Sequence, residues 1–237
     1  MRKAIITAFA VFYASLHGAV NGFSISQSTI GNGLESQSLN VLAKDRQGRL
    51  WVGSDVGISV ISNGIVTNIR DIASEGGLVM LGNVKNIVCT ETVLLACEDR
   101  ILHYDHKKGY ATTLRYNDRI LHTDDFLLEG DIVTFYDADM HSLFTYDMNS
   151  SECNLAAGLS TREDYNFVRI LRSESDSTII YLADDILGLY RYDRSNGSLE
   201  HISGTDRPII ASATAIDKSN VIWLSIPGDG LKGYYIN

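Results

Sequence analysis

The side chains of this sequence that could do chemistry are mostly aspartates in short polar turns. Five of these turns follow an apolar run that is typical of a buried β-strand. Their aspartates are Asp55, Asp99, Asp137, Asp184 and Asp229. Further candidates in nearby turns and connections are Arg100, Tyr116, Arg119, Asp139, His141, Arg162, Tyr165 and Asp185. Charged groups form strong hydrogen bonds with hydroxyl groups, and aromatic faces can stack on sugar rings. This set of residue types is therefore suited to holding a sugar.

Two other interpretations of these aspartates remain open. Each carboxylate could instead accept hydrogen bonds from its own turn, which is a common structural use of Asp. The alternating series Asp137, Asp139, His141 could also hold Ca²⁺ or Mg²⁺, which prefer oxygen ligands. No acidic residue with the spacing of a calcium loop follows this series. We therefore expect no metal and no cofactor.

Catalysis is not indicated by any motif. The sequence contains no Gly-x-Ser-x-Gly elbow, no His-Glu-x-x-His pair and no phosphate-binding loop. Asp184 and Asp185 are adjacent, and neighbouring residues of a strand point to opposite faces. They would make a poor acid/base pair, so the sequence predicts a binding protein and not an enzyme.

The turns must be positioned by a β-hairpin whose clearest copy lies within residues 45–61. Asp45 predicts a turn, because its carboxylate can accept backbone N–H groups two residues further on. Gly48 provides the left-handed residue that ends this turn. Trp51 lies in the apolar strand that follows, and Gly57 marks the next turn. So small a unit cannot bury its own faces, which predicts that several copies pack together.

Copies recur with a period of about 43 residues, which is the length of a β-propeller blade. Asp217, Asn220 and Trp223 repeat the turn and its tryptophan, and Trp223 follows Trp51 by 172 residues, or four periods. Weaker copies lie between them. In these copies we expect Leu95, Val133 and Tyr181 at the position of the tryptophan.

A second marker supports the same repeat. A Tyr-Asp pair ends the third strand of three units, at 104–105, 146–147 and 192–193, and a turn and a fourth strand follow. We therefore predict an all-β fold, a β-propeller of about five four-stranded blades, either closed as a five-bladed ring or part of a larger propeller. The expected units are 38–69, 83–114, 121–156, 167–202 and 210–237, with 23–30 closing the last blade.

This architecture predicts where the candidate residues meet. In a propeller, the loops between second and third strands share one face with the connections between blades. The five turn aspartates should therefore project to one end of the ring, with Arg100 and Arg162 among them.

The pattern from Leu39 through Asp45, Gly48 and Trp51 to Ile58 resembles the two-component regulator propeller repeat. The resemblance implies the periplasmic sensor half of a hybrid two-component system, many of which detect carbohydrates, and hence an oligosaccharide ligand. It also implies a sensor kinase or a further propeller chain as partner, because the kinase domain is absent from this chain. The repeat motif is structural and transfers no ligand residue to this sequence. The alternatives are a truncated, non-signalling sensor fragment and a propeller lyase or hydrolase, since the repeats also loosely resemble streptogramin-lyase-type propellers.

The first 22 residues have the pattern of a secretory signal. Arg2 and Lys3 precede the apolar run Ala4–Leu16, and small residues follow up to Gly22. The run is too short to span a membrane, although an uncleaved anchor is the alternative. Loss of the two basic residues would change the net charge from −9 to −11. This argues against binding of nucleic acid or an anionic membrane, and we expect an exported, periplasmic domain comprising residues 23–237.

The three cysteines do not form a disulfide framework, since their number is odd and their spacing irregular. Cys89 and Cys97 lie in apolar strand patterns, which predicts buried free thiols. A bridge between these two in an oxidising compartment is the alternative. Cys153 has no expected partner.

Overall fold

The structure is a computed structural model, and it describes residues 33–159, 165–202, 205, 213–226 and 228–236. These residues form β-strands and turns. The first sheet contains β1 (Leu39–Lys44), β2 (Leu50–Ser54), β3 (Gly57–Ser62) and β4 (Ile65–Ile69). It is an antiparallel meander in which each strand pairs with the next. The predicted signal, residues 1–22, and the predicted closing strand, residues 23–30, lie outside the described residues.

The remaining sheets repeat this meander with additions. The second sheet contains β7 (Val84–Cys89), β8 (Val93–Cys97), β9 (Ile101–Asp105) and β10 (Tyr110–Thr113), extended at its outer edge by the hairpin β5 (Asp71–Ser74) and β6 (Gly77–Met80). The third contains β13 (Leu127–Glu129), β14 (Ile132–Asp137), β15 (Ser142–Asp147) and β16 (Cys153–Gly158). The fourth contains β17 (Phe167–Arg172), β18 (Ile179–Asp184), β19 (Gly188–Asp193) and β20 (Ser198–His201). The fifth contains β21 (Ala213–Ile216), β22 (Val221–Ile226) and β23 (Gly230–Tyr235), and a small separate hairpin pairs β11 (Arg115–Tyr116) with β12 (Arg119–Ile120).

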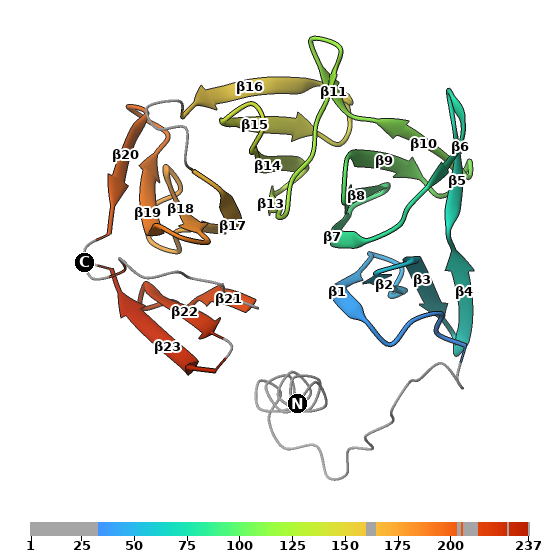
Figure 1. The fold of residues 1–237 in the computed structure, drawn as a ribbon, viewed down its shortest axis with the longest axis horizontal. Helices are drawn as coiled ribbons and strands as arrows, with labels where there is room; N and C mark the ends of the chain where they lie inside the picture. The colour runs from blue at the N-terminus through green and yellow to red at the C-terminus, as the bar shows by residue number, and fades with distance from the viewer. Residues whose placement is uncertain (1–32, 160–164, 203–204, 206–212, 227, 237) are drawn as a thin grey trace.

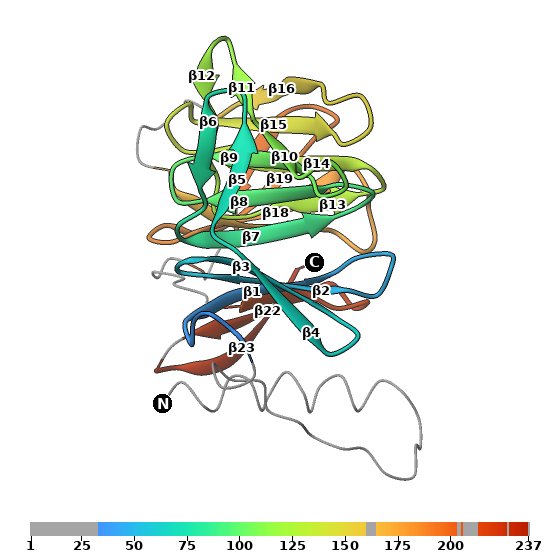
Figure 2. The same ribbon diagram turned by 90° about the vertical axis from the view of Figure 1, so that its right-hand side faces the viewer.

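The five sheets are the blades of a β-propeller. Figure 1 shows them side by side around a common axis, with the first strand of each sheet toward the centre and the later strands toward the rim. The first and fifth sheets stand at the two ends of this row, and Figure 2 shows the sheets from the side. The prediction of an all-β propeller with about five blades is confirmed.

The turn around Asp45 forms as its sequence predicts. The Asp45 carboxylate accepts backbone N–H groups from Gln47 at 3.0 Å and Arg49 at 2.9 Å, and Gly48 has a φ of 82°. The same carboxylate accepts the Trp51 indole N–H at 2.9 Å. Burial alone would raise the pKa of Asp45, but the hydrogen bonds from Trp51 and Arg49 outweigh this effect and lower it. The aspartate therefore fixes both the turn and the orientation of the tryptophan.

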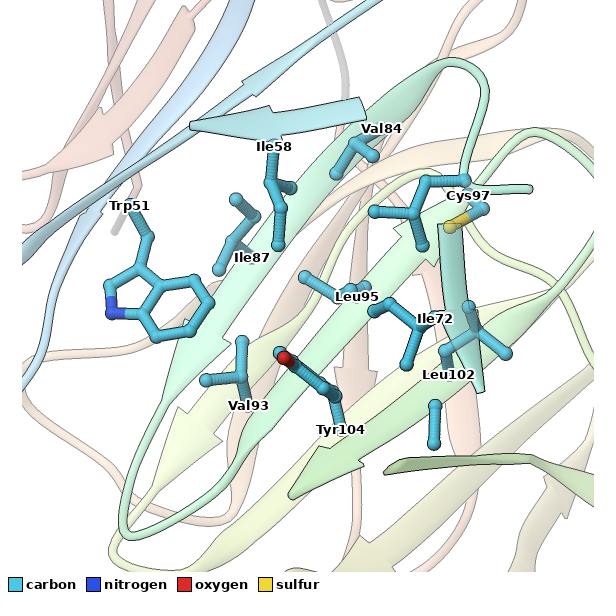
Figure 3. Packing of buried hydrophobic residues seen from close by; sticks show 12 residues of the cluster. Trp51, Ile58, Ile72, Val84, Ile87, Val93, Leu95, Cys97, Leu102 and Tyr104 are labelled. Carbon is cyan, nitrogen blue, oxygen red and sulfur yellow. The ribbon is translucent and has the colours of Figure 1, made fainter. Parts of the chain in front are cut away.

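Trp51 lies in the contact between the first and second sheets. It is 1% exposed and packs in one cluster with residues of both sheets, as Figure 3 shows for Ile58, Ile87 and Val93. Tyr104 meets its ring edge-on at 6.3 Å. The fifth sheet repeats the hairpin but not the burial. Trp223 donates to Asp217 at 2.9 Å, yet it is only half-buried, whereas Trp51 is buried.

Leu95 and Val133 were expected at the position of Trp51 in the second and third sheets. This prediction is wrong, because each lies one residue away from the true equivalent. Trp51 faces the following sheet, whereas Leu95 packs back toward the first sheet and Val133 back toward the second. The residues that face the following sheet, as Trp51 does, are Leu94 and Thr134, the sequence neighbours of Leu95 and Val133. A slip of one residue in a strand transfers a side chain to the opposite face. The aromatic counterpart Tyr181 in the fourth sheet does face forward, in the cluster shared with the fifth.

All three cysteines are free thiols. Cys97 is buried, whereas Cys89 and Cys153 keep some exposed surface. Burial raises the pKa of Cys89 and Cys97 to about 12 and that of Cys153 to about 11. The expectation of free thiols in packed strands therefore agrees with the structure, and these thiols are poor nucleophiles at neutral pH.

Candidate functional site

Two of the predicted turn aspartates, Asp137 and Asp184, are fully buried and hold the backbone. Asp184 accepts N–H groups from Asn166 at 2.6 Å, from Ile186 at 2.9 Å and from Leu187 at 2.7 Å. Each aspartate thus ties its own turn to the segment that enters its sheet from the preceding one.

Asp137 uses its two oxygens in the same way. One accepts the Met140 N–H within the turn at 2.9 Å, and the other accepts the His122 N–H at 2.9 Å. The alternative in which these carboxylates bond their own turns therefore describes both residues, and neither is exposed to a ligand.

The other three turn aspartates are exposed and already paired. Asp55 accepts the hydroxyl of Ser36 at 2.5 Å. Asp99 forms two hydrogen bonds with Arg100, at 2.9 and 2.5 Å, and Asp229 forms an ion pair with Lys232. The hydrogen bond from Arg100 lowers the pKa of Asp99, which also lies within the electrostatic influence of His122. These three carboxylates lie at the surface, each beside a polar or charged partner.

The remaining predicted residues lie in different places. Tyr116 and Arg119 belong to the β11–β12 hairpin, which Figure 1 shows at the rim. Tyr165 is buried and stacks on Phe167 with ring centroids 5.1 Å apart. Asp185 accepts the side-chain N–H of Asn166 at 2.9 Å. Arg162 lies outside the described residues.

The turn that carries Asp139 and His141 gives no metal site. His141 has a φ of 46°, so it supplies the left-handed residue of the turn. Asp139 is exposed, 3.8 Å from the ring of His122. Among the residues that the structure describes, no group of three His, Cys, Asp or Glu side chains could hold a metal ion.

A cavity of about 320 Å³ opens between the second, third and fourth sheets. Its lining residues are Lys85, Glu98, His122, Thr123, Asp124, Tyr136, Ala138, Asn166 and Phe167. They come from the end of β14 and the loop that follows it, the loop between β8 and β9, the starts of β7 and β17, and the connection into β13. This is the face on which the second-to-third-strand loops were expected to meet the connections between blades. We call this cavity the inter-blade cavity.

Charged groups on one wall of the inter-blade cavity form a network. The Lys85 ammonium lies 2.7 Å from Asp124 and 3.4 Å from Glu98, and Glu98 also accepts a hydrogen bond from Asn83 at 2.7 Å. Burial would lower the pKa of Lys85, but its two carboxylate partners outweigh this effect and raise it. The hydrogen bond from Asn83, followed by the charge of Lys85, lowers the pKa of Glu98. The wall therefore offers one cation between two anions.

The other walls are positioned by the buried aspartates. Asp137 holds the backbone of His122, and Asp184 holds the backbone of Asn166. Tyr136 donates its hydroxyl to the carbonyl of Tyr165 at 3.1 Å, and its ring meets Phe167 edge-on at 5.0 Å. The predicted aspartates thus support the cavity from behind and do not line it.

A further carboxyl, Asp125, joins the same three sheets next to the cavity. It accepts hydrogen bonds from the side chain of Asn86 in β7 and from the backbone N–H of Ile170 in β17, the latter at 2.9 Å. Burial of the carboxyl raises its pKa to about 6, although the charge of Arg169 opposes this shift. One side chain beside the cavity therefore links the strands β7 and β17 to the connection that enters β13.

Sequence reasoning missed all nine lining residues of the inter-blade cavity. Lys85, Glu98, His122, Asp124 and Asn166 were not among the candidates. The connections between blades could have pointed to these residues, because His122, Asp124 and Asn166 lie there. Within those connections the aromatic and arginine residues were chosen, and these turned out to lie at the rim, in the core or outside the described residues.

The segment that carries Trp51 matches a known protein family. Residues 33–55 match the family model of the two component regulator propeller. This confirms the resemblance seen in the sequence. No curated protein matches the chain.

Solved structures with a similar fold include extracellular domains of putative hybrid two component systems. The extracellular domain of the putative hybrid two component system BT3049 from B. thetaiotaomicron superposes with a TM-score of 0.69 at 16% identity, over 90% of this chain and 30% of that one. The corresponding domain of BT4673 from the same organism gives 0.62 at 18% identity, over 85% of this chain and 26% of that one. The computationally designed protein Ika8 gives 0.55 at 13% identity, over 84% and 58%.

The chain therefore spans less than a third of the length of these two structures. Its fold resembles that of the extracellular domains of these putative hybrid two component systems. In the part of the chain that the structure describes, there is no helix with the length and hydropathy that a membrane crossing requires.

Proposed function

We propose that this chain is an exported input module of a two-component signalling system and that its inter-blade cavity binds a carbohydrate. The observation that supports this most is the lining of the cavity, which combines the Lys85, Asp124 and Glu98 network with the aromatic side chains of Tyr136 and Phe167. Hydrogen bonds between sugar hydroxyls and charged groups contribute roughly 1.5–3 kcal/mol each. A few such bonds together with an apolar wall are typical of small-molecule sites.

Charged groups close to the lining residues would extend this site. Asp99 and Arg100 follow Glu98 directly, and Asp139 lies 3.8 Å from the ring of His122. A chain of several sugar units could therefore contact the cavity and these groups together. The ion pairs within the cavity are already satisfied, which suits reversible binding better than bond cleavage. Signal transfer would then require a partner, either a sensor kinase or a further propeller chain.

The test expresses the full chain, residues 1–237, so that its predicted leader is present and export is assayed in the same experiment. Residues 23–237 are the expected mature domain. We expect the mature chain in the periplasm, and recovery of only the full-length chain in the cytoplasm would contradict export. A glycan array of the mature domain identifies the ligand, and calorimetry then compares variants.

We expect Lys85→Gln to weaken binding at least about tenfold, or roughly 1.4 kcal/mol, because it removes the cation that orders both carboxylates. Lys107→Gln is the matched control. Lys107 also pairs with a glutamate, Glu91 at 3.3 Å, but at an exposed site away from the cavity. Binding of a neutral sugar should depend little on salt. Equal affinities for all three proteins would remove the cavity from consideration.

A further inference from the structure

Arg49 joins the first sheet to the second through a histidine. Its Nε atom donates to Asp45 at 2.6 Å, and its guanidinium lies over the Trp51 ring, 5.4 Å from the ring centre. Its Nη2 atom donates to Nε2 of His106 at 2.7 Å. His106 lies in the turn between β9 and β10 of the second sheet. This hydrogen bond therefore connects two neighbouring blades beside the tryptophan that is buried between them.

The hydrogen bond determines the protonation state of His106. An arginine guanidinium has only donors and stays charged throughout the physiological pH range. Nε2 of His106 must therefore accept, so the imidazole is neutral and carries its proton on Nδ1. Nδ1 is buried and has no hydrogen-bond partner among the described residues. The imidazole also meets the Trp51 ring edge-on, with ring centroids 5.7 Å apart.

A second proton on His106 is incompatible with this arrangement. It would bind to Nε2, so that two N–H donors and two positive charges would face each other at the contact with Arg49. The two nearest carboxylates are already paired. Asp45 is bound to Arg49 at 2.6 Å, and Asp105 forms an ion pair with Lys108 at 2.8 Å. Neither is free to receive the charged imidazole, so the contact with Arg49 must break.

The electrostatic surroundings of His106 oppose its protonation. Burial lowers the pKa of His106, and the charges of Arg49 and Lys107 lower it further. The charges of Asp105 and Asp45 act in the opposite direction but do not cancel this shift. A histidine whose pKa is lowered by folding contributes stability that is fully present above its ordinary value of 6.5 and is lost as the pH falls below it. Acidification therefore destabilises this contact.

The other titratable groups at the contact do not change charge in this pH range. The turn between β7 and β8 contributes Glu91, which pairs with Lys107 at 3.3 Å and with Arg46 at 3.4 Å. The hydrogen bond from Lys107 lowers the pKa of Glu91. Burial raises the pKa of Cys89 to about 12, and it also raises that of Tyr104. His106 is therefore the group at this contact that responds to mild acid.

We propose that Arg49 and His106 form an acid-sensitive latch between the first and second blades. At neutral pH the latch is closed, and Arg49 ties the Asp45 turn to the turn between β9 and β10. Protonation of His106 opens the latch by repulsion from Arg49. The edge of the contact around Trp51, which Figure 3 shows among the side chains of both sheets, then becomes accessible to water. The fold thus contains a device by which acidification loosens one contact between blades.

The fluorescence of Trp51 reports the state of the latch, once Trp223→Phe leaves Trp51 as the only tryptophan. We expect the fluorescence and the urea midpoint of this protein to fall together between about pH 8 and about pH 5, where histidine titrates. His106→Gln in the same background is the matched variant, because the glutamine carbonyl can accept the Arg49 N–H and does not titrate. Its midpoint should fall about half as far or less, and its fluorescence should stay constant.

His103 acts as an internal control for this comparison. Burial lowers its pKa as well, but it is present in both proteins, so its contribution to acid sensitivity cancels. Nitrogen NMR of the unmodified chain at about pH 8 tests the latch without any substitution. We expect the proton of His106 on Nδ1. A proton on Nε2 would overturn the proposal, and so would an equal loss of urea midpoint on acidification in the His106→Gln protein and its parent.

Discussion

Replacing Asp184 with alanine should lower the free energy of unfolding by at least about 3 kcal/mol. The Asp184 carboxylate is fully buried and accepts three backbone N–H groups, at 2.6, 2.7 and 2.9 Å. Alanine would leave these donors without a partner, and an unsatisfied buried polar group costs about 1–3 kcal/mol. Urea unfolding followed by tryptophan fluorescence measures the loss.

The matched control is Asp55→Ala. Asp55 lies in the corresponding turn of the first sheet, but it is exposed and accepts a hydrogen bond from the hydroxyl of Ser36. We expect a change within about 0.5 kcal/mol, as for other surface substitutions. If Asp184→Ala unfolds at the same urea concentration as Asp55→Ala, the carboxylate does not hold the connection between the third and fourth sheets. Because Asp184 also positions Asn166, its loss should weaken ligand binding in the inter-blade cavity.

Local turn chemistry explains why the first and fifth hairpins could be predicted from sequence. Asp45 and Asp217 each bond backbone groups within four residues of themselves, and Gly48 and Asn220 each supply a positive φ. These interactions lie within a few residues and leave a readable pattern. The tryptophans also show which face of the strand is directed toward the following sheet.

Where that marker is absent, the sequence did not determine the face of the strand. In β8 and β14, apolar residues occupy consecutive positions because both faces are buried. Such a strand shows no alternation from which its register could be read. The choice of Leu95 and Val133 over Leu94 and Thr134 was wrong for this reason.

The inter-blade cavity could not be predicted for a different physical reason. Its lining residues come from three sheets and are separated by up to 82 positions, from Lys85 to Phe167. Their proximity depends on how the sheets pack around the axis, which repeat spacing does not specify. The same packing decides whether a turn aspartate is buried, as in Asp137, or exposed, as in Asp55. The sequence predicted the face that carries these residues, but not their individual roles.

The second large effect concerns the two tryptophans, which are equivalent in the repeat but not in their surroundings. Trp51→Ala should cost roughly 3–5 kcal/mol, because it empties a packed contact between two sheets. Trp223→Ala should cost about half as much or less, because Trp223 is half-buried. Its sheet stands at one end of the row of described sheets in Figure 1. Equilibrium unfolding in urea gives both values.

The chain contains only these two tryptophans, so each can be observed alone after the other is changed to phenylalanine. We expect acrylamide to quench the fluorescence of Trp223 in the folded Trp51→Phe protein, and to quench Trp51 much less in the Trp223→Phe protein. Equal stability losses together with equal quenching would mean that the fifth sheet is already covered within one chain, as in a closed five-bladed ring.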